Sequence, residues 1–483
     1  MDRTASRSAR TAIAERRSID YIPDAERHGN LCSQFSLWFG ANLQITAVVV
    51  GALAVVLGGD VFWSLIGLLV GQILGGAVMA LHGAQGPQLG LPQMISSRVQ
   101  FGVYGAIIPL VLVCVMYVGF SAGGTVLAGQ AIGELLDVNN TVAILIFAAV
   151  VILLTGLGYR IIHAMGRVSS IVGTLAFLYL FASLLTGHAW SSLIANRHFT
   201  VASFLLAVSL SASWQIAYGP YVADYSRYLP KSTSTLKTFF AVFSGTVIGA
   251  QVSMTFGVLA AALAGNRFSG HEVAFIVGLG ATGTIAAILY FTIALGKLTI
   301  TTLNAYGSVM SVATIVTGLG QRREVSRRTR LAFVILSVSA SSALALAGQH
   351  SFLKAFSSFL LFLLVFFTPW SAINLVDYYC VTRERYDVPA LFDANGRYGR
   401  WNPVGITVYV AGVLVQMPFV ATGFYTGRWV EYLGGVDISW IVGIVVPGAL
   451  YYAATHFAPS RVPDQLILPD TLSDEAGARE TLI

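Results

Sequence analysis

Long runs of apolar residues dominate this chain. Twelve such segments can be drawn, and each can supply the roughly 20 residues that a helix needs to cross a bilayer. They centre on 34–58, 61–81, 102–131, 141–158, 168–187, 201–222, 237–264, 283–313, 331–348, 353–381, 404–423 and 436–456. Only 10% of the 483 residues are charged, against about 25% in an ordinary soluble domain. We therefore expect an all-α polytopic membrane protein with twelve transmembrane helices.

The basic residues predict the orientation of these spans. With the N-terminus inside, 23 of the 28 Lys and Arg residues fall in inner segments, and four (Arg197, Arg267, Lys354 and Arg428) fall outside. This asymmetry follows the positive-inside rule. We expect both termini in the cytoplasm, and a multi-pass protein of the cytoplasmic (inner) membrane. Residues 1–33 contain no apolar run of signal-peptide length. Topology and anionic lipid account for the net charge of +6, so no nucleic-acid partner is expected.

The first span carries polar residues where an apolar helix is expected. Gly40, Asn42 and Gln44 interrupt it within five residues. A discontinuous membrane helix exposes backbone carbonyls that can hold ions and substrates. The competing interpretation is a close-packed glycine whose neighbouring amides bond to another helix.

The sixth span is interrupted in a similar way. Gly219-Pro220 breaks the helix, because proline lacks an N–H and glycine adds backbone freedom. Trp214, Gln215 and Tyr218 lie just before the break, and an aromatic plane beside an amide suits a flat heterocycle. An interfacial aromatic belt is the alternative, but Trp214 is too deep for it, at about 15 Å of helix from Asp224.

Two interrupted helices five spans apart predict an inverted repeat. We expect a cytoplasmic segment 1–33, a first five-helix repeat 34–187 and a second, inverted repeat 201–381. A cytoplasmic loop 382–403, two peripheral helices within 404–456 and a flexible cytoplasmic tail 457–483 would follow.

The eighth span has a polar stripe. Lys297, Thr301, Asn304 and Ser308 follow helical spacing and should face a cavity. Hydroxyls that bond back to their own helix are the plainer explanation for the threonines. No Asp or Glu lies near the middle of any span. Ion coupling would therefore use neutral oxygens that bind Na⁺, or the amine of Lys297 as a proton carrier or a fixed ammonium. No other metal and no cofactor are expected.

Several motifs occur in order along the chain. They are RSIDYIPDAERHG (17–29), WFGANLQ (38–44), the inner loop GPQLGLPQMISSRVQFG (86–102), GPYVADYSRYLP (219–230), PWSAINLVDYY (369–379), YDVPALF (386–392) and GRYG (396–399). In these motifs the chain resembles the nucleobase–cation symporter-1 family, in its purine–cytosine permease-like branch.

The resemblance implies a leucine-transporter-type fold and alternating-access uptake of a small heterocycle, often with Na⁺ or H⁺. It places substrate contacts on spans 1, 3, 6 and 8, here at Gly40, Asn42, Gln44, Phe120, Gly124, Trp214, Gln215, Tyr218, Asn304 and Gly307. It places the family's sodium site on span-1 carbonyls such as that of Ala41, on the Leu298 carbonyl and on the Thr301 and Thr302 hydroxyls.

This chain departs from the family in two places. Phe120 and Gly124 stand where the third span often carries a stacking Trp and an amide, which leaves room for a bulkier substrate. Lys297 lies beside the sodium site and puts Na⁺ dependence in doubt. We expect a monomeric secondary active importer of a nucleobase or related nitrogen heterocycle, and not an enzyme. The alternative is an amino-acid or amine transporter of the same fold.

Overall fold

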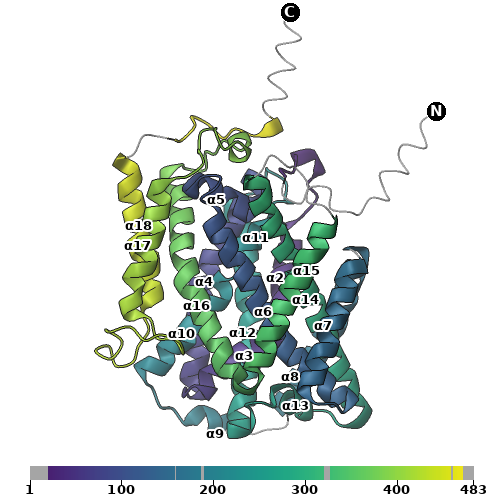
Figure 1. Cartoon of the computed structure of the whole chain (residues 1–483). Coiled ribbons are helices and arrows are strands. Elements are labelled where there is room, and N and C mark those ends of the chain that lie inside the picture. Colours follow the sequence, from purple (N-terminus) through teal and green to yellow (C-terminus); the bar gives the residue numbers. More distant parts are fainter. Residues whose placement is uncertain (1–19, 158, 187–189, 320–326, 458–460, 471–483) are drawn as a thin grey trace, which may run out of the picture.

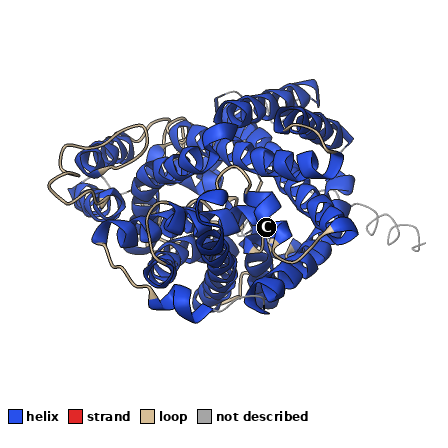
Figure 2. Cartoon of the chain, turned by 90° about the horizontal axis from the view of Figure 1, so that it is seen from below, coloured by secondary structure: helices blue, strands red, loops and turns tan. Residues whose placement is uncertain are grey.

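The structure, a computed structural model, describes residues 20–470 except 158, 187–189, 320–326 and 458–460. The described chain is a bundle of helices, and its first and last described segments lie at the same end of it, where Tyr21 bonds to Asp470 (Figure 1). This end is called the end that carries the termini. Seen along the bundle, helices fill the whole section (Figure 2). In chain order they are α2 (Leu31–Asn42), α3 (Ile45–Val56), α4 (Val61–Leu89), α5 (Gln93–Phe101), α6 (Ile107–Leu136), α7 (Asn140–Leu157), α8 (Tyr159–Thr186), α9 (Trp190–Ala195), α10 (Val201–Ile216), α11 (Gly219–Ser226), α12 (Thr235–Ala264), α13 (Glu272–Gly278), α14 (Gly283–Leu319), α15 (Arg327–Gly348), α16 (Phe352–Leu375), α17 (Pro403–Gln416) and α18 (Ser439–Phe457).

A helix, or a bent pair of helices, falls on each of the twelve apolar segments that the sequence predicts. Within the described residues, seven continuous helical stretches are long and apolar enough to cross a membrane, or nine when each bent pair counts as one span. Helices α7 and α17 are apolar but shorter, and α15 and α16 lie within one of the seven stretches. The prediction of an all-α polytopic membrane protein is confirmed.

Two bends lie inside this bundle. Helices α2 and α3 meet at 58°, and α10 and α11 meet at 40°. The first bend falls at Leu43 and Gln44, where Gln44 is extended with φ −146° and ψ 154°. Gly40 belongs to the helix before it, so the break begins later than the sequence indicates. The second bend comes directly before Gly219-Pro220, as predicted.

Polar side chains fix where several helices begin. Asn30 and Ser33 form a reciprocal capping box at the start of α2, with the Ser33 N–H donating to Asn30 Oδ1 at 2.8 Å. Asp60 caps α4 by accepting from the Trp63 N–H at 2.9 Å. Each cap satisfies backbone donors that have no partner within the helix. The caps therefore fix where α2, which leads into the first bend, and α4, which follows α3, begin.

The segment 86–102 is not the simple inner loop that the sequence predicts. Helix α4 continues to Leu89, and α5 follows with all of its residues buried. Arg98 of α5 donates to the Leu391 carbonyl at 3.0 Å and to the Thr314 carbonyl at 3.3 Å. Burial lowers the pKa of this guanidinium to about 10. The sequence analysis did not predict α5 because its residues have low hydropathy. A helix that is surrounded by protein rather than by lipid does not need an apolar surface on all sides.

The first part of the C-terminal tail is held in place. The Ile467 N–H donates to the Tyr386 carbonyl at 2.9 Å, and its own carbonyl accepts from Val388 at 3.0 Å. The Tyr21 hydroxyl donates to Asp470 at 2.9 Å. Within the expected flexible tail 457–483, residues 461–470 thus bond to the rest of the chain, and 458–460 and 471–483 lie outside the described residues. The flexibility of the tail stays a prediction. The bounds of the two five-helix repeats stay a prediction.

Glycines let the bent spans approach their neighbours closely. A Cβ at Gly257 of α12 would lie 1.8 Å from the Val48 carbonyl oxygen of α3. A Cβ at Gly51 of α3 would lie 2.1 Å from the Met254 carbonyl oxygen of α12. Backbone atoms cannot yield to such contacts, so these glycines set the distance between α3 and α12.

We predict that Gly257→Ala destabilises the protein, because the added methyl group would push α12 away from α3. Overpacking of this kind costs about 1–3 kcal/mol or more. Gly348→Ala at the end of α15 is the matched control, since its Cβ would meet Ala355 at an ordinary 3.9 Å. Thermal unfolding in detergent would show a lower Tm for Gly257→Ala alone. Equal Tm values for the two variants would contradict the close contact.

Candidate functional site

A cavity of about 1090 Å³ lies beside both helix breaks. Phe35 of α2, Arg167 near the start of α8 and Tyr225 of α11 line it toward the end of the bundle that carries the termini. In the other direction it reaches Ile276 of α13. Most of its lining is apolar, with a few convergent polar groups, which is the usual composition of a small-molecule site.

The structure brings most of the predicted site residues to this cavity. Those that line it are Gly40, Ala41, Gln44, Phe120, Gly124, Trp214, Tyr218, Lys297, Thr301 and Asn304. Five predicted residues do not line it, and for these the expected direct contact with a ligand is not supported: Asn42, Gln215, Leu298, Thr302 and Gly307.

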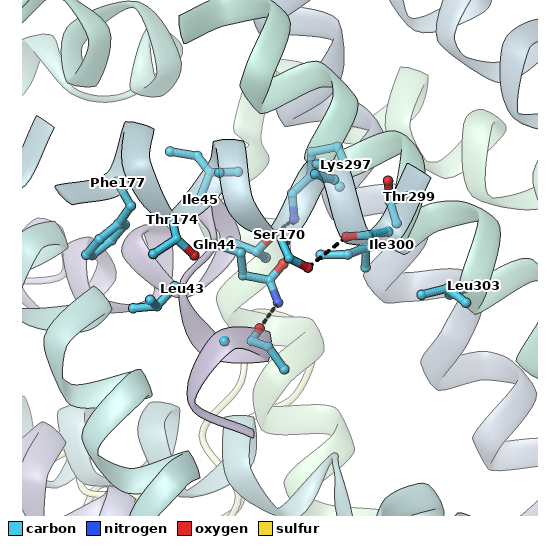
Figure 3. A pocket seen from close by; sticks show the side chains of 18 of the residues that line it. Leu43, Gln44, Ile45, Ser170, Thr174, Phe177, Lys297, Thr299, Ile300 and Leu303 are labelled. Carbon is cyan, nitrogen blue, oxygen red and sulfur yellow. Dashed lines mark hydrogen bonds between the residues drawn. The ribbon is translucent and has the colours of Figure 1, made fainter. Parts of the chain in front are cut away.

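The first break is bridged by a lysine from across the cavity. Lys297 of α14 donates to Gln44 Oε1 at 2.8 Å and also to Thr46 Oγ1. Gln44 Nε2 in turn donates to the Ala41 carbonyl at 2.8 Å. Figure 3 shows Lys297 and Gln44 extending toward one another from different helices. A lysine only donates and a carbonyl only accepts, so the two neighbours fix which way the Gln44 amide points.

Asn42, which does not line the cavity, fixes the position of the Trp214 side chain of α10. The indole N–H of Trp214 donates to Asn42 Oδ1 at 2.7 Å. Its ring meets Phe120 of α6 edge to face, with centroids 5.7 Å apart, and meets Tyr218 at the same distance. Because the indole N–H is already bonded, Trp214 offers its aromatic carbon surface to the cavity.

A buried network explains why Asn42 and Gln215 lie outside the cavity. Asn42 Nδ2 donates to Thr246 Oγ1 at 3.1 Å, and the Thr246 hydroxyl donates to Gln215 Oε1 at 2.6 Å. Gln215 also donates to Gln72 of α4. These amides join α2, α4, α10 and α12, so they bond to neighbouring helices, as the competing interpretation of the first span foresaw. A buried network in which every member is paired fixes its helices in place.

The polar stripe of α14 divides into two parts. Lys297, Thr301 and Asn304 line the cavity, whereas Ser308 is buried away from it. The Thr302 hydroxyl donates to the Leu298 carbonyl at 2.7 Å, so this threonine bonds to its own helix. Gly307 instead lies against the ring of Tyr117, which occupies the space beside it.

Gly124 makes room for the lysine. A Cβ at this position would lie 3.5 Å from both Lys297 Cδ and Thr301 Oγ1, which is van der Waals contact. A side chain of amide size at position 124 would therefore meet Lys297. The two departures from the resembled family, Gly124 and Lys297, are thus neighbours in space.

Sequence reasoning missed two parts of the lining. Ser170, Thr174 and Phe177 of α8 line one wall, and their spacing of i, i+4 and i+7 was a usable signal. Tyr221 and Tyr225 extend the aromatic surface of Tyr218 with a similar spacing. The neighbours of Ser170, Thr174 and Phe177 in α8 are mostly apolar, so hydropathy alone did not distinguish these three from packing residues.

We predict that Asn42→Ala destabilises the ligand-free protein, since it leaves the buried Trp214 indole N–H without its acceptor. A lost buried partner costs about 1–3 kcal/mol. Asn304→Ala is the control, because Asn304 faces the cavity and its loss should change stability by less than about 0.5 kcal/mol. Thermal unfolding without ligand measures both, and an unchanged Tm in Asn42→Ala would remove the positioning role.

Three comparisons with known proteins place the chain. The model of a family described as "Permease for cytosine/purines, uracil, thiamine, allantoin" matches residues 21–443. The putative purine-cytosine permease YxlA of Bacillus subtilis is 39% identical over 442 residues, which cover 91% of this chain and 95% of that protein. The purine-cytosine permease fcyB of Emericella nidulans is 25% identical, with 92% and 88% covered.

Solved structures agree on the fold. Mhp1, a nucleobase-cation-symport-1 family transporter, matches in a closed conformation with bromovinylhydantoin bound, with a TM-score of 0.71, 19% identity and 91% and 95% of the two chains covered. Its inward-facing conformation matches with a TM-score of 0.74, 20% identity and 91% and 93% covered. The predicted leucine-transporter-type fold and the predicted family are both confirmed. The chain therefore belongs to the family of permeases for cytosine/purines, uracil, thiamine and allantoin, and it is a membrane transporter rather than an enzyme.

Proposed function

We propose that this permease imports a nucleobase or a closely related nitrogen heterocycle by alternating access. The observation that carries the proposal is the pair of aromatic rings, Trp214 and Phe120, beside the amides of Gln44 and Asn304 in one cavity. Rings can stack on a flat heterocycle, and amides can pair with its edge. The names of its relatives, purine-cytosine permeases, agree with this ligand class.

The Gln44 amide predicts part of the ligand's hydrogen-bonding pattern. Its oxygen accepts from Lys297, and one of its two N–H groups donates to Ala41. Tyr218 also hydrogen-bonds to Gln44, so a ligand would share the second N–H with this hydroxyl or displace it. We therefore expect a ring carbonyl or an unprotonated ring nitrogen of the substrate at this position, as nucleobases offer.

We also propose that the Lys297 ammonium takes the place of a coupling Na⁺. Two of the carbonyls that the family resemblance assigns to sodium, those of Ala41 and Leu298, already accept from Gln44 and Thr302. Lys297 itself extends to Gln44 and Thr46 at the first break. A fixed cation here would make uptake independent of Na⁺, and loading or release of its proton would make uptake depend on pH.

The cavity extends toward the end of the bundle that carries both termini. With 23 of 28 basic residues at that end by the expected topology, we propose that this end is cytoplasmic and that the protein lies in the inner membrane. We propose the monomer as the transporting unit, because one chain supplies the whole cavity.

We predict that Trp214→Ala weakens nucleobase binding about 5- to 150-fold, the equivalent of about 1–3 kcal/mol for a lost stacking ring. Trp401→Ala, an exposed tryptophan at the end that carries the termini, is the control. Competition binding with cytosine, adenine and hypoxanthine on purified protein measures the effect. An unaltered dissociation constant would return Trp214 to a packing role. Displacement by amino acids or amines alone would favour the alternative substrate class.

We predict that Lys297→Met lowers uptake at least tenfold, because Gln44 and Thr46 lose their shared donor and the site loses its positive charge. Wild-type uptake should not respond to replacement of Na⁺ by choline. The control is Lys354→Met, which removes an exposed charge outside the cavity. Uptake in vesicles across a range of pH and Na⁺ tests both statements. Unchanged profiles in Lys297→Met would exclude the lysine from coupling.

A further inference from the structure

A row of aromatic rings leads away from the central site. Tyr218, Tyr221 and Tyr225 follow the i, i+3, i+7 spacing of one helix face along α11. The ring centroids of Trp214 and Tyr218 are 5.7 Å apart, and those of Tyr218 and Tyr221 are also 5.7 Å apart. All of these residues line the same cavity. The aromatic surface at Trp214 therefore continues toward the end that carries the termini.

Two more rings close around this row. Trp38 of α2 lies 5.5 Å from Tyr218 and 5.5 Å from Tyr225, centroid to centroid. Tyr117 of α6 lies 5.7 Å from Tyr221. Both added residues line the cavity as well. Rings from three helices thus surround one portion of the cavity, and most of these rings also pack into the hydrophobic core.

One polar atom in this cluster is left without a partner. The indole N–H of Trp38 is buried and has no hydrogen-bond acceptor among the described residues, and the Trp38 side chain is only 2% exposed. A buried donor without an acceptor is costly. A heterocycle that stacked among these rings could supply a carbonyl or ring nitrogen to it.

The size of the cavity leaves space for a second ligand. Pockets that enclose a whole drug-sized molecule measure about 300–1,000 Å³, and this cavity measures about 1090 Å³. A nucleobase is much smaller than a drug-sized molecule. A single base at Trp214 would therefore leave the tyrosine portion open.

We propose that Trp38, Tyr117, Tyr218, Tyr221 and Tyr225 form a second stacking site for the same nitrogen heterocycle, between the central site and the end of the bundle that carries the termini. The inference rests on the proposed function. The second site binds more weakly than the central one, because it lacks the Gln44 and Asn304 amides. Its rings bind the base during release. Transfer between two adjacent stacking sites lets the base leave in two steps, each with a smaller loss of binding energy than release from one tight site.

Binding stoichiometry tests this proposal. Equilibrium dialysis of detergent-purified protein with tritiated hypoxanthine, and in parallel with tritiated cytosine, should show two molecules per chain, the second at least tenfold weaker. Tyr221→Leu keeps an apolar side chain but removes the ring, so it should bind one molecule per chain. Tyr221→Phe keeps the ring and should retain both. Tyr432→Ala, at an 87% exposed position, is the control.

The outcomes separate the two proposals. One molecule per chain at every concentration in the wild type, or two in Tyr221→Leu, would overturn the second site and leave the proposed function standing. Binding of neither base to the wild type would overturn the proposed function and the second site together. Loss of the tighter molecule alone in Trp214→Ala would identify the central site as the stronger of the two.

Discussion

Every backbone N–H and C=O that a broken helix releases inside a membrane needs a partner, because lipid offers none. This chain breaks two helices beside one cavity, at Leu43–Gln44 and before Gly219-Pro220. Protein side chains must therefore gather around both breaks. Gln44 serves the first break by donating to the Ala41 carbonyl. The backbone groups at the breaks need protein partners. The cavity, the buried amides and Lys297 are accordingly found beside the breaks.

Lys297 joins the two sides of the cavity. Its amine reaches from α14 to Gln44 and Thr46, which belong to the first break and the helix after it. The absence of a side chain at Gly124 leaves the space that the lysine crosses. The contact of Lys297 with Gln44 and Thr46 therefore has three effects. It orients the Gln44 amide that we expect to contact the substrate, it brings positive charge to the first break, and it connects α14 to α3. Movement of either helix during transport would have to change it, which links ion coupling to substrate recognition in our proposal.

The positions of the helices could be predicted from the sequence more reliably than which side of each helix faces the cavity. Apolar runs identify membrane spans because lipid contact requires them, and each predicted run became a helix or a bent pair. Which polar residue enters the cavity could not be predicted, since adjacent helix residues point about 100° apart and a bend resets the phase. In the first span Gln44 faces the cavity, whereas Asn42 does not. In α14 Thr301 faces the cavity, whereas the Thr302 hydroxyl bonds to its own helix. Helix α5 was not predicted for another reason. Protein surrounds it, so its hydropathy does not distinguish it from a loop.

The most direct test of the account is the thermal stability of the purified protein with candidate ligands, with and without Na⁺. A ligand that binds only the folded state raises the Tm, and the rise grows with the logarithm of its concentration relative to its dissociation constant. We predict that cytosine or a purine raises the Tm, that Na⁺ does not change this rise, and that amino acids have no effect. Stabilisation by amino acids alone, or by nucleobases only when Na⁺ is present, would contradict it.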